Sequence, residues 1–450
     1  MRRINMEAND ENVLKSIQEN TLDRNKNVKE IIEAIETVHG NFFICLDAEW
    51  GSGKTFFVRQ TEKTLEYLTQ KIWRLEEYET EEEFQQLTSV FGKTILDDIN
   101  LKQSYLPIYY NAWLYDNHDD PLMSLIYVLL KKTGQYVDTK IEPPKKEKLL
   151  NALSSLSLSV QYNDLQITAG AAGLKELFAS KEVLEKIKTT EDTKSIVEHV
   201  FDTIICETAQ KLVIFVDELD RCRPYYAIEM LERIKHYIDD ERIIIVFSMN
   251  KAQLVHTVKK IYGTEFDASA YLNRFFDISL HLPRCNTDEY LLKRNLQQYT
   301  KDKLMKLANE LKVSNSLSIR EQIIYLTKIQ SIIEHRASYE NDEWTFLVIL
   351  IACYCLLDIR DVEGERKLAR GEGEEIIKRI ICDSKMAKRL IAYFVEETKV
   401  NEESFERGWE EFVRIYKFVF RNAETQAYYP GKFEIGRSIR NEFLRLCNFI

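Results

Sequence analysis

The sequence predicts an α/β fold in which a parallel sheet is flanked by helices, followed along the chain by a mainly helical region. Up to about residue 284, short apolar runs that end in polar residues alternate with segments of helical periodicity. This alternation is typical of parallel strands joined by helices. From 285 to 450 the periodicity is helical. We therefore predict two domains, at 1–284 and 285–450.

The expected strands and helices follow one another in a regular order. An amphipathic helix at 25–38 leads into a first strand at 42–46, and the segment 138–191 reads as an insertion whose secondary structure the pattern leaves open. Further strands are expected at 106–111, 211–217, 242–250 and 277–283, and helices at 122–130, 195–209 and 268–276. In the C-terminal region, the glycines of 363–373 predict an exposed loop between helices.

Composition narrows the class of protein. With 45% hydrophobic and 30% charged residues, the 450-residue chain is typical of globular proteins. A formal charge of -11 argues against a surface broadly suited to nucleic acid, although it does not exclude a local basic groove. The eight cysteines form no C-x-x-C pair, and no apolar run is long enough for a membrane span or a signal peptide. We therefore expect a cytoplasmic protein without a zinc site.

The segment 42–60 predicts a phosphate-binding loop of the Walker A type. A buried strand is followed by a glycine turn and by a helix that opens on Lys54 and Thr55. Lysine suits the β and γ phosphates, and the threonine hydroxyl suits Mg²⁺. Ala48 replaces the first glycine of the pattern, which is harmless if that position needs no positive φ. The residues expected to bind nucleotide are Glu49, Trp50, Gly51, Ser52, Gly53, Lys54, Thr55 and Phe56.

A second apolar run, 211–217, ends in acids, as in a Walker B strand. We expect Asp217 to hold Mg²⁺ through a bound water, and Glu218 to orient or deprotonate the attacking water. Acids at strand ends are common. Together with the loop that ends at Thr55, however, they complete a site for Mg²⁺ and a nucleoside triphosphate, in which Lys54 and Glu218 are the first candidates for catalysis.

Two further candidates carry alternatives. Asn250, or Ser248 beside it, ends the strand 242–250 and could contact the γ phosphate or the water; Asn250 could equally cap the helix that begins at Lys251. Arg274 could act as an arginine finger, within the chain or toward a neighbouring subunit, and a surface salt bridge is the alternative.

Four motifs together resemble the KAP family of P-loop NTPases over roughly 20–283. They are Trp50–Thr55, Asn111–Trp113, Asp217–Cys222 and Tyr271–Phe275. The resemblance implies an additional-strand P-loop ATPase, in which another strand separates the acid strand from the loop strand. The family includes an animal neuronal membrane scaffold and bacterial phage-exclusion proteins, many with inserted membrane helices that this chain lacks. This chain departs from the family pattern at Ala48, and it has Asp217–Glu218 where the family usually has Asp-Asp.

The remaining motif residues have both structural and functional interpretations. Asn111 could hold Glu218 away from water or cap the end of its strand. We expect Trp113 to pack beneath the nucleotide site, because large aromatic residues are usually buried. Asp220 and Arg221 are expected to pair and brace the site, although Arg221 or Arg223 could reach phosphate across a subunit interface. Cys222 is expected to be buried.

The predicted activity is an ATPase switch that binds ATP and Mg²⁺ and gates a partner. The switch would gate a separate effector protein, a homo-oligomer of this chain, or both. The expected setting is bacterial anti-phage defence. The helical region shows no nuclease or protease motif, so an effector activity would lie in a partner. Two alternatives stay open: a non-hydrolysing nucleotide-dependent scaffold and a nucleic-acid-stimulated ATPase sensor.

Overall fold

The computed structural model divides the chain into two compact units, Met1–Cys285 and Asn286–Ile450. The insertion expected at 138–191 lies outside the described residues from residue 141 onward. The structure describes residues 7–74, 81–118, 120–140, most of 194–205, 209–294, 296, 299–336, 342–397, 400–421, 427–428, 435–436 and 438–447.

The first unit is built on a five-stranded parallel sheet, which confirms the predicted fold class. Its strand order is β2-β3-β4-β1-β5, so β4 separates the acid strand β3 from the loop strand β1, as the family resemblance implies. The strands are β1 (Phe42–Asp47), β2 (Tyr105–Asn111), β3 (Lys211–Asp217), β4 (Ile243–Met249) and β5 (Ile278–His281).

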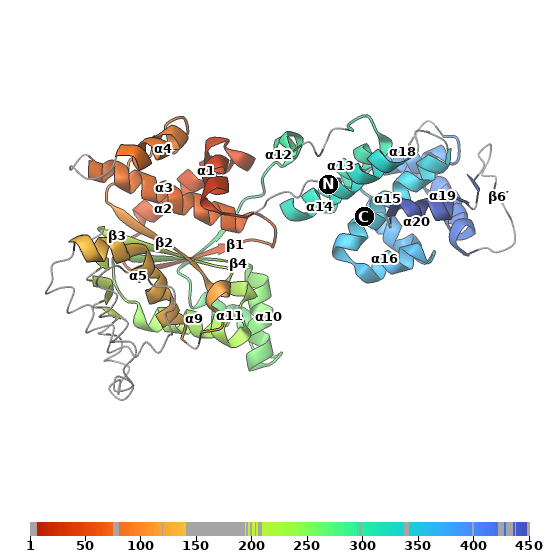
Figure 1. The fold of residues 1–450 in the computed structure, drawn as a ribbon. Coiled ribbons are helices and arrows are strands. Elements are labelled where there is room, and N and C mark those ends of the chain that lie inside the picture. Colours follow the sequence, from red (N-terminus) through yellow and green to blue (C-terminus); the bar gives the residue numbers. More distant parts are fainter. Residues whose placement is uncertain are drawn as a thin grey trace. The chain divides into compact units, whose positions relative to one another are not determined.

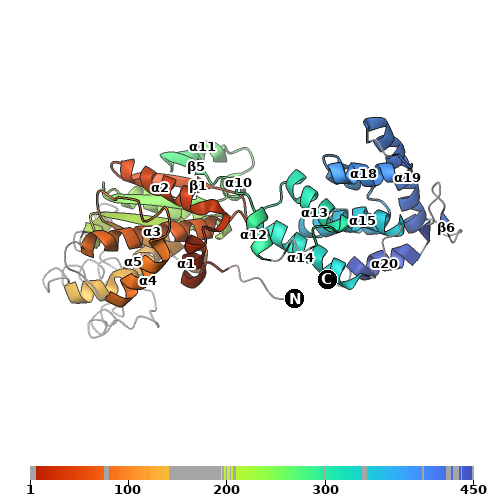
Figure 2. The same cartoon turned by 90° about the horizontal axis from the view of Figure 1, so that it is seen from above.

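Helices cover both faces of this sheet (Figure 1). Four helices, α1 to α4, lie on one face, and Figure 2 shows them from their own side; α5, α9, α10 and α11 lie on the other. Their bounds are α1 Asp10–Gln18, α2 Arg24–Thr37, α3 Lys54–Arg74, α4 Glu81–Phe91, α5 Pro121–Lys140, α9 Pro224–Tyr237, α10 Lys251–Tyr262 and α11 Ala268–Asn273. The described positions between 194 and 205 are helical.

Alternate residues of each strand enter two separate cores. In β1, Phe43 and Cys45 pack with α5 and α9 to α11, whereas Ile44 and Leu46 pack with α1 to α4. Burial on both faces explains why the strands read as continuous apolar runs. The register aligns the strand ends, with Asn111 beside Asp217 and Asp217 beside Ser248. The polar groups of β2, β3 and β4 therefore meet at the carboxyl edge of the sheet.

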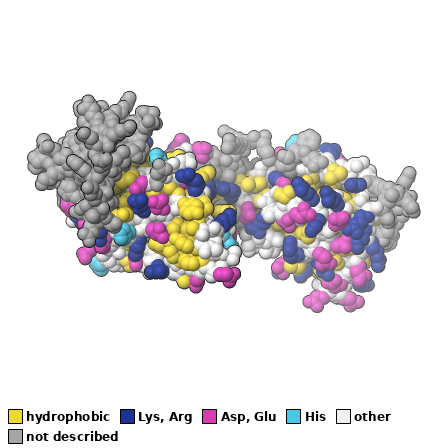
Figure 3. Space-filling view, turned by 90° about the horizontal axis from the view of Figure 1, so that it is seen from below, with side chains coloured by type: hydrophobic (Ala, Val, Ile, Leu, Met, Phe, Trp, Pro, Cys, Tyr) yellow, Lys and Arg dark blue, Asp and Glu magenta, His cyan; other side chains and the backbone are white. Residues whose placement is uncertain are grey.

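Exposed apolar side chains occur on the helices α9 and α10. Tyr225, at the start of α9, is 76% exposed, and Tyr262, at the end of α10, is 45% exposed. Figure 3 views the molecule from the side of α9 to α11 and shows hydrophobic side chains gathered on this unit, with Lys and Arg beside them. Such a patch on a globular unit is typical of a contact surface.

The second unit is helical around α15, most of which is buried. No helix in the described part of the chain is long and apolar enough to cross a membrane. Besides the antiparallel pair β6 (Ala427–Tyr428) and β7 (Ile435–Gly436), its elements are α12 Asp288–Lys293, α13 Lys303–Ser314, α14 Ile319–His335, α15 Asp342–Arg360, α16 Val362–Ala369, α17 Glu374–Ile381, α18 Lys385–Tyr393, α19 Glu402–Arg421 and α20 Ser438–Cys447.

The loop expected at 363–373 is mostly helical, so that prediction was wrong. The helix α16 begins at Val362 because the Asp361 side chain accepts a hydrogen bond from the Gly364 N–H at 2.8 Å. Gly364 lies in the first turn, where a glycine is tolerated. Only Gly371, with φ of 79°, and its neighbours before α17 form a turn.

Candidate functional site

The glycine turn after β1 has the backbone that a phosphate-binding loop needs. Gly51 and Gly53 have φ values of 78° and 90°, which favour glycine. Ala48 has no positive φ, and its N–H donates a hydrogen bond to the Met249 carbonyl at 3.1 Å. The alanine therefore fits the loop without strain, and α3 begins directly after it at Lys54.

The Lys54 side chain lies inside this loop and is only 9% exposed. Its Nζ donates to the carbonyl oxygens of Ala48 at 2.6 Å and of Glu49 at 3.2 Å. Burial lowers the pKa of Lys54, and the nearby carboxylates, Asp220 first, oppose that shift. Among the described residues, the acceptors of this ammonium group are neutral carbonyl oxygens, and phosphate oxygens would be stronger acceptors.

Asp217 is fully buried at the end of β3. Its Oδ2 accepts a hydrogen bond from the Tyr109 hydroxyl at 3.2 Å, whereas Oδ1 and the neighbouring Ser248 Oγ have no hydrogen-bond partner among the described residues. Burial raises the pKa of Asp217, and the hydrogen bond from Tyr109 opposes the shift. A buried carboxylate oxygen without a partner fits the oxygen-rich coordination shell of Mg²⁺.

Glu218 follows with a left-handed backbone, at φ of 63°. Its Oε1 accepts a hydrogen bond from Thr55 Oγ1 at 3.1 Å, and its Oε2 forms an ion pair with Arg221 Nε. Burial and then the charge of Asp217 raise the pKa of Glu218. A non-glycine residue in this region is strained, and such strain is concentrated at functional sites. The structure thus brings Lys54, Thr55, Asp217 and Glu218 together.

The tryptophans of the motifs lie at the rim of this site. The Trp50 indole N–H donates to Asp220. Trp113 is 52% exposed, with the Arg221 guanidinium 5.6 Å from its ring centroid. The expectation that Trp113 packs beneath the nucleotide site was wrong, because it lies in the short 3-10 helix η2 (Ala112–Tyr115), where Ala112 takes the buried position.

Asp220 and Arg221 do not pair with each other, contrary to the expected brace. Asp220 bonds to Trp50 and Arg221 pairs with Glu218, so both still stabilise the site edge. Arg223 is engaged by Asp116, whose carboxylate accepts from the Arg223 backbone N–H at 3.0 Å and whose carbonyl accepts from its guanidinium. Cys222 is buried, as predicted.

Both asparagines cap helices. The Asn250 side chain accepts from the Gln253 N–H at 3.2 Å and begins α10. The Asn111 side chain accepts from the Leu114 N–H at 3.2 Å and begins η2. The capping interpretation is therefore confirmed for each, and a contact of Asn250 with phosphate stays a prediction.

Arg274 is exposed at the end of α11. No carboxylate of the described residues forms an ion pair with it, so the expected salt bridge is not found in that part of the chain. A role for Arg274 as an arginine finger stays a prediction.

Two residues near the loop had not been predicted. Tyr109 contacts Asp217, and the buried Arg24 donates to the carbonyl oxygens of Ser52 at 3.3 Å and Pro283 at 2.8 Å. Arg24 precedes an apolar helical stripe, which gave no signal for a buried arginine. Tyr109 had one usable signal, its place two residues before the strand-end Asn111.

A model of the KAP family P-loop domain matches residues 24–394. The matched region runs beyond the predicted 20–283 into the helical unit. A search of the curated proteins returned no match.

Proposed function

This chain belongs to the KAP family of P-loop domains, and from that premise we propose that it is a Mg²⁺-dependent ATPase that works as a molecular switch. Membership of the family implies nucleotide binding. Hydrolysis is supported chiefly by one observation, the convergence of Lys54 and Thr55 on Asp217 and Glu218 at the carboxyl edge of the sheet. ATP, rather than another triphosphate, is part of the proposal.

In the proposed mechanism, the amides of the glycine turn and Lys54 bind the triphosphate. Thr55 and Asp217 would hold Mg²⁺, which would neutralise charge on the phosphates. Glu218 orients the attacking water and takes its proton. Ser248 or Asn250, at the end of β4, is proposed to contact the γ phosphate, and Arg274 is proposed to serve as an arginine finger.

The contacts of Glu218 suggest how turnover is controlled. Its carboxylate is engaged by Thr55 and by Arg221. To reach water it must leave the ion pair, and Thr55 must turn toward Mg²⁺. The site would therefore change its internal contacts between the free and the nucleotide-bound states, as a switch requires.

The partner that the switch gates is proposed to be a second copy of the chain, a separate effector protein or both. The hydrophobic side chains that Figure 3 shows gathered on the first unit support a protein contact there. The proposed role in anti-phage defence depends on the resemblance to bacterial phage-exclusion members of the family.

One observation favours a second candidate function. Because Glu218 is engaged by Arg221 and Thr55 rather than free, ATP could bind and stabilise an assembly without being hydrolysed. Light scattering with ATP, ADP and a non-hydrolysable analogue separates the two. For a switch, the analogue causes lasting assembly or dissociation, whereas the change caused by ATP reverses as the ATP is consumed. For a scaffold, ATP and the analogue cause the same change over time.

A nucleic-acid sensor predicts a distinct result in an assay of phosphate release. Turnover would rise on addition of DNA or RNA and would fall steeply with salt. We expect no such stimulation from a chain with a formal charge of -11. A stimulation of about tenfold that salt removes would overturn that expectation.

A further inference from the structure

The two oxygens of the Asp217 carboxylate have different surroundings. Oδ2 accepts from the Tyr109 hydroxyl at 3.2 Å, and Oδ1 is buried with no hydrogen-bond partner in the part of the chain that the structure describes. Tyr109 and Asp217 come from adjacent strands, β2 and β3, where Tyr109 pairs with Phe215 and Asn111 with Asp217. The tyrosine hydroxyl therefore reaches along the sheet to the acid of the neighbouring strand.

Tyr109 is itself held from the other side. The Arg59 guanidinium lies 4.7 Å from the centroid of the Tyr109 ring, a cation–π distance that stabilises both groups. Arg59 is a residue of α3, little more than one turn beyond Lys54 and Thr55. The helix that begins with the phosphate-binding residues thus also supports the tyrosine that contacts Asp217.

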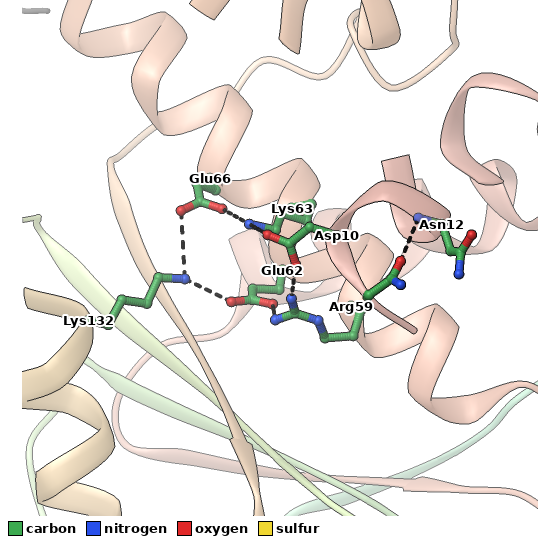
Figure 4. Close-up of polar contacts among 8 residues, drawn as sticks. Asp10, Asn12, Arg59, Glu62, Lys63, Glu66 and Lys132 are labelled. Carbon is green, nitrogen blue, oxygen red and sulfur yellow. Dashed lines mark hydrogen bonds and ion pairs between the residues drawn. The ribbon is translucent and has the colours of Figure 1, made fainter. Parts of the chain in front are cut away.

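Arg59 is fixed by a network of charges, shown in Figure 4. Its guanidinium forms ion pairs with Asp10 of α1 and with the buried Glu62. Lys132 of α5 pairs with Glu62 at 2.7 Å, and Lys63 pairs with Asp10 at 2.9 Å. The network joins three helices, so Arg59 has little freedom to move away from the ring.

We infer that Tyr109 is a positioning residue of the metal site: its hydroxyl holds Oδ2 of Asp217, which leaves Oδ1 for Mg²⁺ and its water shell. Without the hydroxyl, the carboxylate could rotate and turn either oxygen toward Thr55 or Ser248. This role depends on the proposed function, because it presumes that Asp217 serves Mg²⁺·ATP.

The test compares nucleotide affinity with Mg²⁺ and with EDTA, by fluorescence of a labelled ATP. Wild type is expected to bind more tightly with Mg²⁺. Tyr109→Phe should lose roughly tenfold of that Mg²⁺ enhancement, the low end of what one hydrogen bond to a charged group contributes, with unchanged affinity in EDTA. The Mg²⁺ concentration for half-maximal binding should rise in proportion.

The matched control is Tyr110→Phe, the next residue of the same strand. Its hydroxyl bonds to Ser124 at 2.7 Å and Tyr226 at 2.6 Å, on the opposite face of the sheet from Asp217. This variant loses a buried hydroxyl of the same kind and should keep the Mg²⁺ enhancement. Equal losses in both variants would show a general structural effect and overturn the inference.

A second variant guards against a folding defect in Tyr109→Phe. Arg59→Lys keeps the charge for Asp10 and Glu62 but removes the planar group over the Tyr109 ring. We therefore expect it to lose part of the Mg²⁺ enhancement, less than Tyr109→Phe loses. A full Mg²⁺ enhancement in both variants would overturn the positioning role while leaving nucleotide binding intact. Wild type that binds nucleotide neither with Mg²⁺ nor with EDTA would instead overturn the proposed function.

Discussion

Replacing Arg221 tests whether its ion pair restrains Glu218. In Arg221→Gln the carboxylate keeps the Thr55 hydrogen bond, which nucleotide and Mg²⁺ would release, but loses its cationic partner. We expect basal ATP hydrolysis to rise, because less free energy is needed to turn Glu218 toward water.

The size of the effect follows from the exposure of the pair. The Arg221 side chain is 31% exposed and that of Glu218 is 14% exposed, so solvent screening limits the pair to about 1 kcal/mol. If the whole of this free energy is now spent on breaking the ion pair before hydrolysis, removing the pair lowers the activation free energy by the same amount and raises the rate about fivefold. The assay is steady-state phosphate release at saturating Mg²⁺·ATP.

Arg233→Gln is the matched control. Arg233 is 33% exposed and pairs with Asp120 at 3.0 Å and Glu229 at 3.1 Å, away from the nucleotide site, so its loss should leave turnover unchanged. A fall in the rate of Arg221→Gln would refute the restraint. It would favour the alternative that Arg221 reaches phosphate across a subunit interface.

Three further predictions concern stability and the loop. Asp217→Asn should raise the melting temperature of the nucleotide-free protein at pH 7.5, because burial raises the pKa of Asp217 and the ionised form costs stability. As the pH falls toward that raised pKa, the wild type recovers this stability, so the gap between the melting curves should narrow; a widening gap would contradict the sign. Ala48→Gly should change nucleotide affinity by less than about twofold, since Ala48 needs no positive φ, and a larger gain by titration would indicate a strained loop. Trp113→Ala should cost less than about 1 kcal/mol of unfolding free energy in urea, whereas Trp409→Ala, at a residue 7% exposed, should cost about 3 kcal/mol or more; similar costs would mean that Trp113 is buried.

The sheet and the phosphate loop could be predicted because their physical requirements are local. A strand buried on both faces must be apolar throughout, and the loop after β1 needs glycines at Gly51 and Gly53, where φ is positive. Strand ends in a parallel sheet meet at one edge, so Asp217 and Lys54 were expected together from sequence alone.

Other features depend on tertiary contacts that leave little trace in sequence. Trp113 was expected inside because tryptophan is apolar, but the short helix η2 turns it outward and Arg221 lies over its ring. Tyr109 acquires its role only through Asp217 on the neighbouring strand and Arg59 on α3. The glycines of 363–373 suggested a loop, whereas the cap at Asp361 begins a helix there.

Phosphate release by wild type, Lys54→Ala and Glu218→Gln, with nucleotide binding measured in parallel, tests the central claim most directly. Wild type should hydrolyse Mg²⁺·ATP. Lys54→Ala should lose binding and turnover together, because it removes the ammonium from the loop. Glu218→Gln should bind ATP but hydrolyse it about 100-fold more slowly or worse, since an amide cannot take the proton. Equal rates in all three proteins would contradict the assignment of this site as the place of hydrolysis.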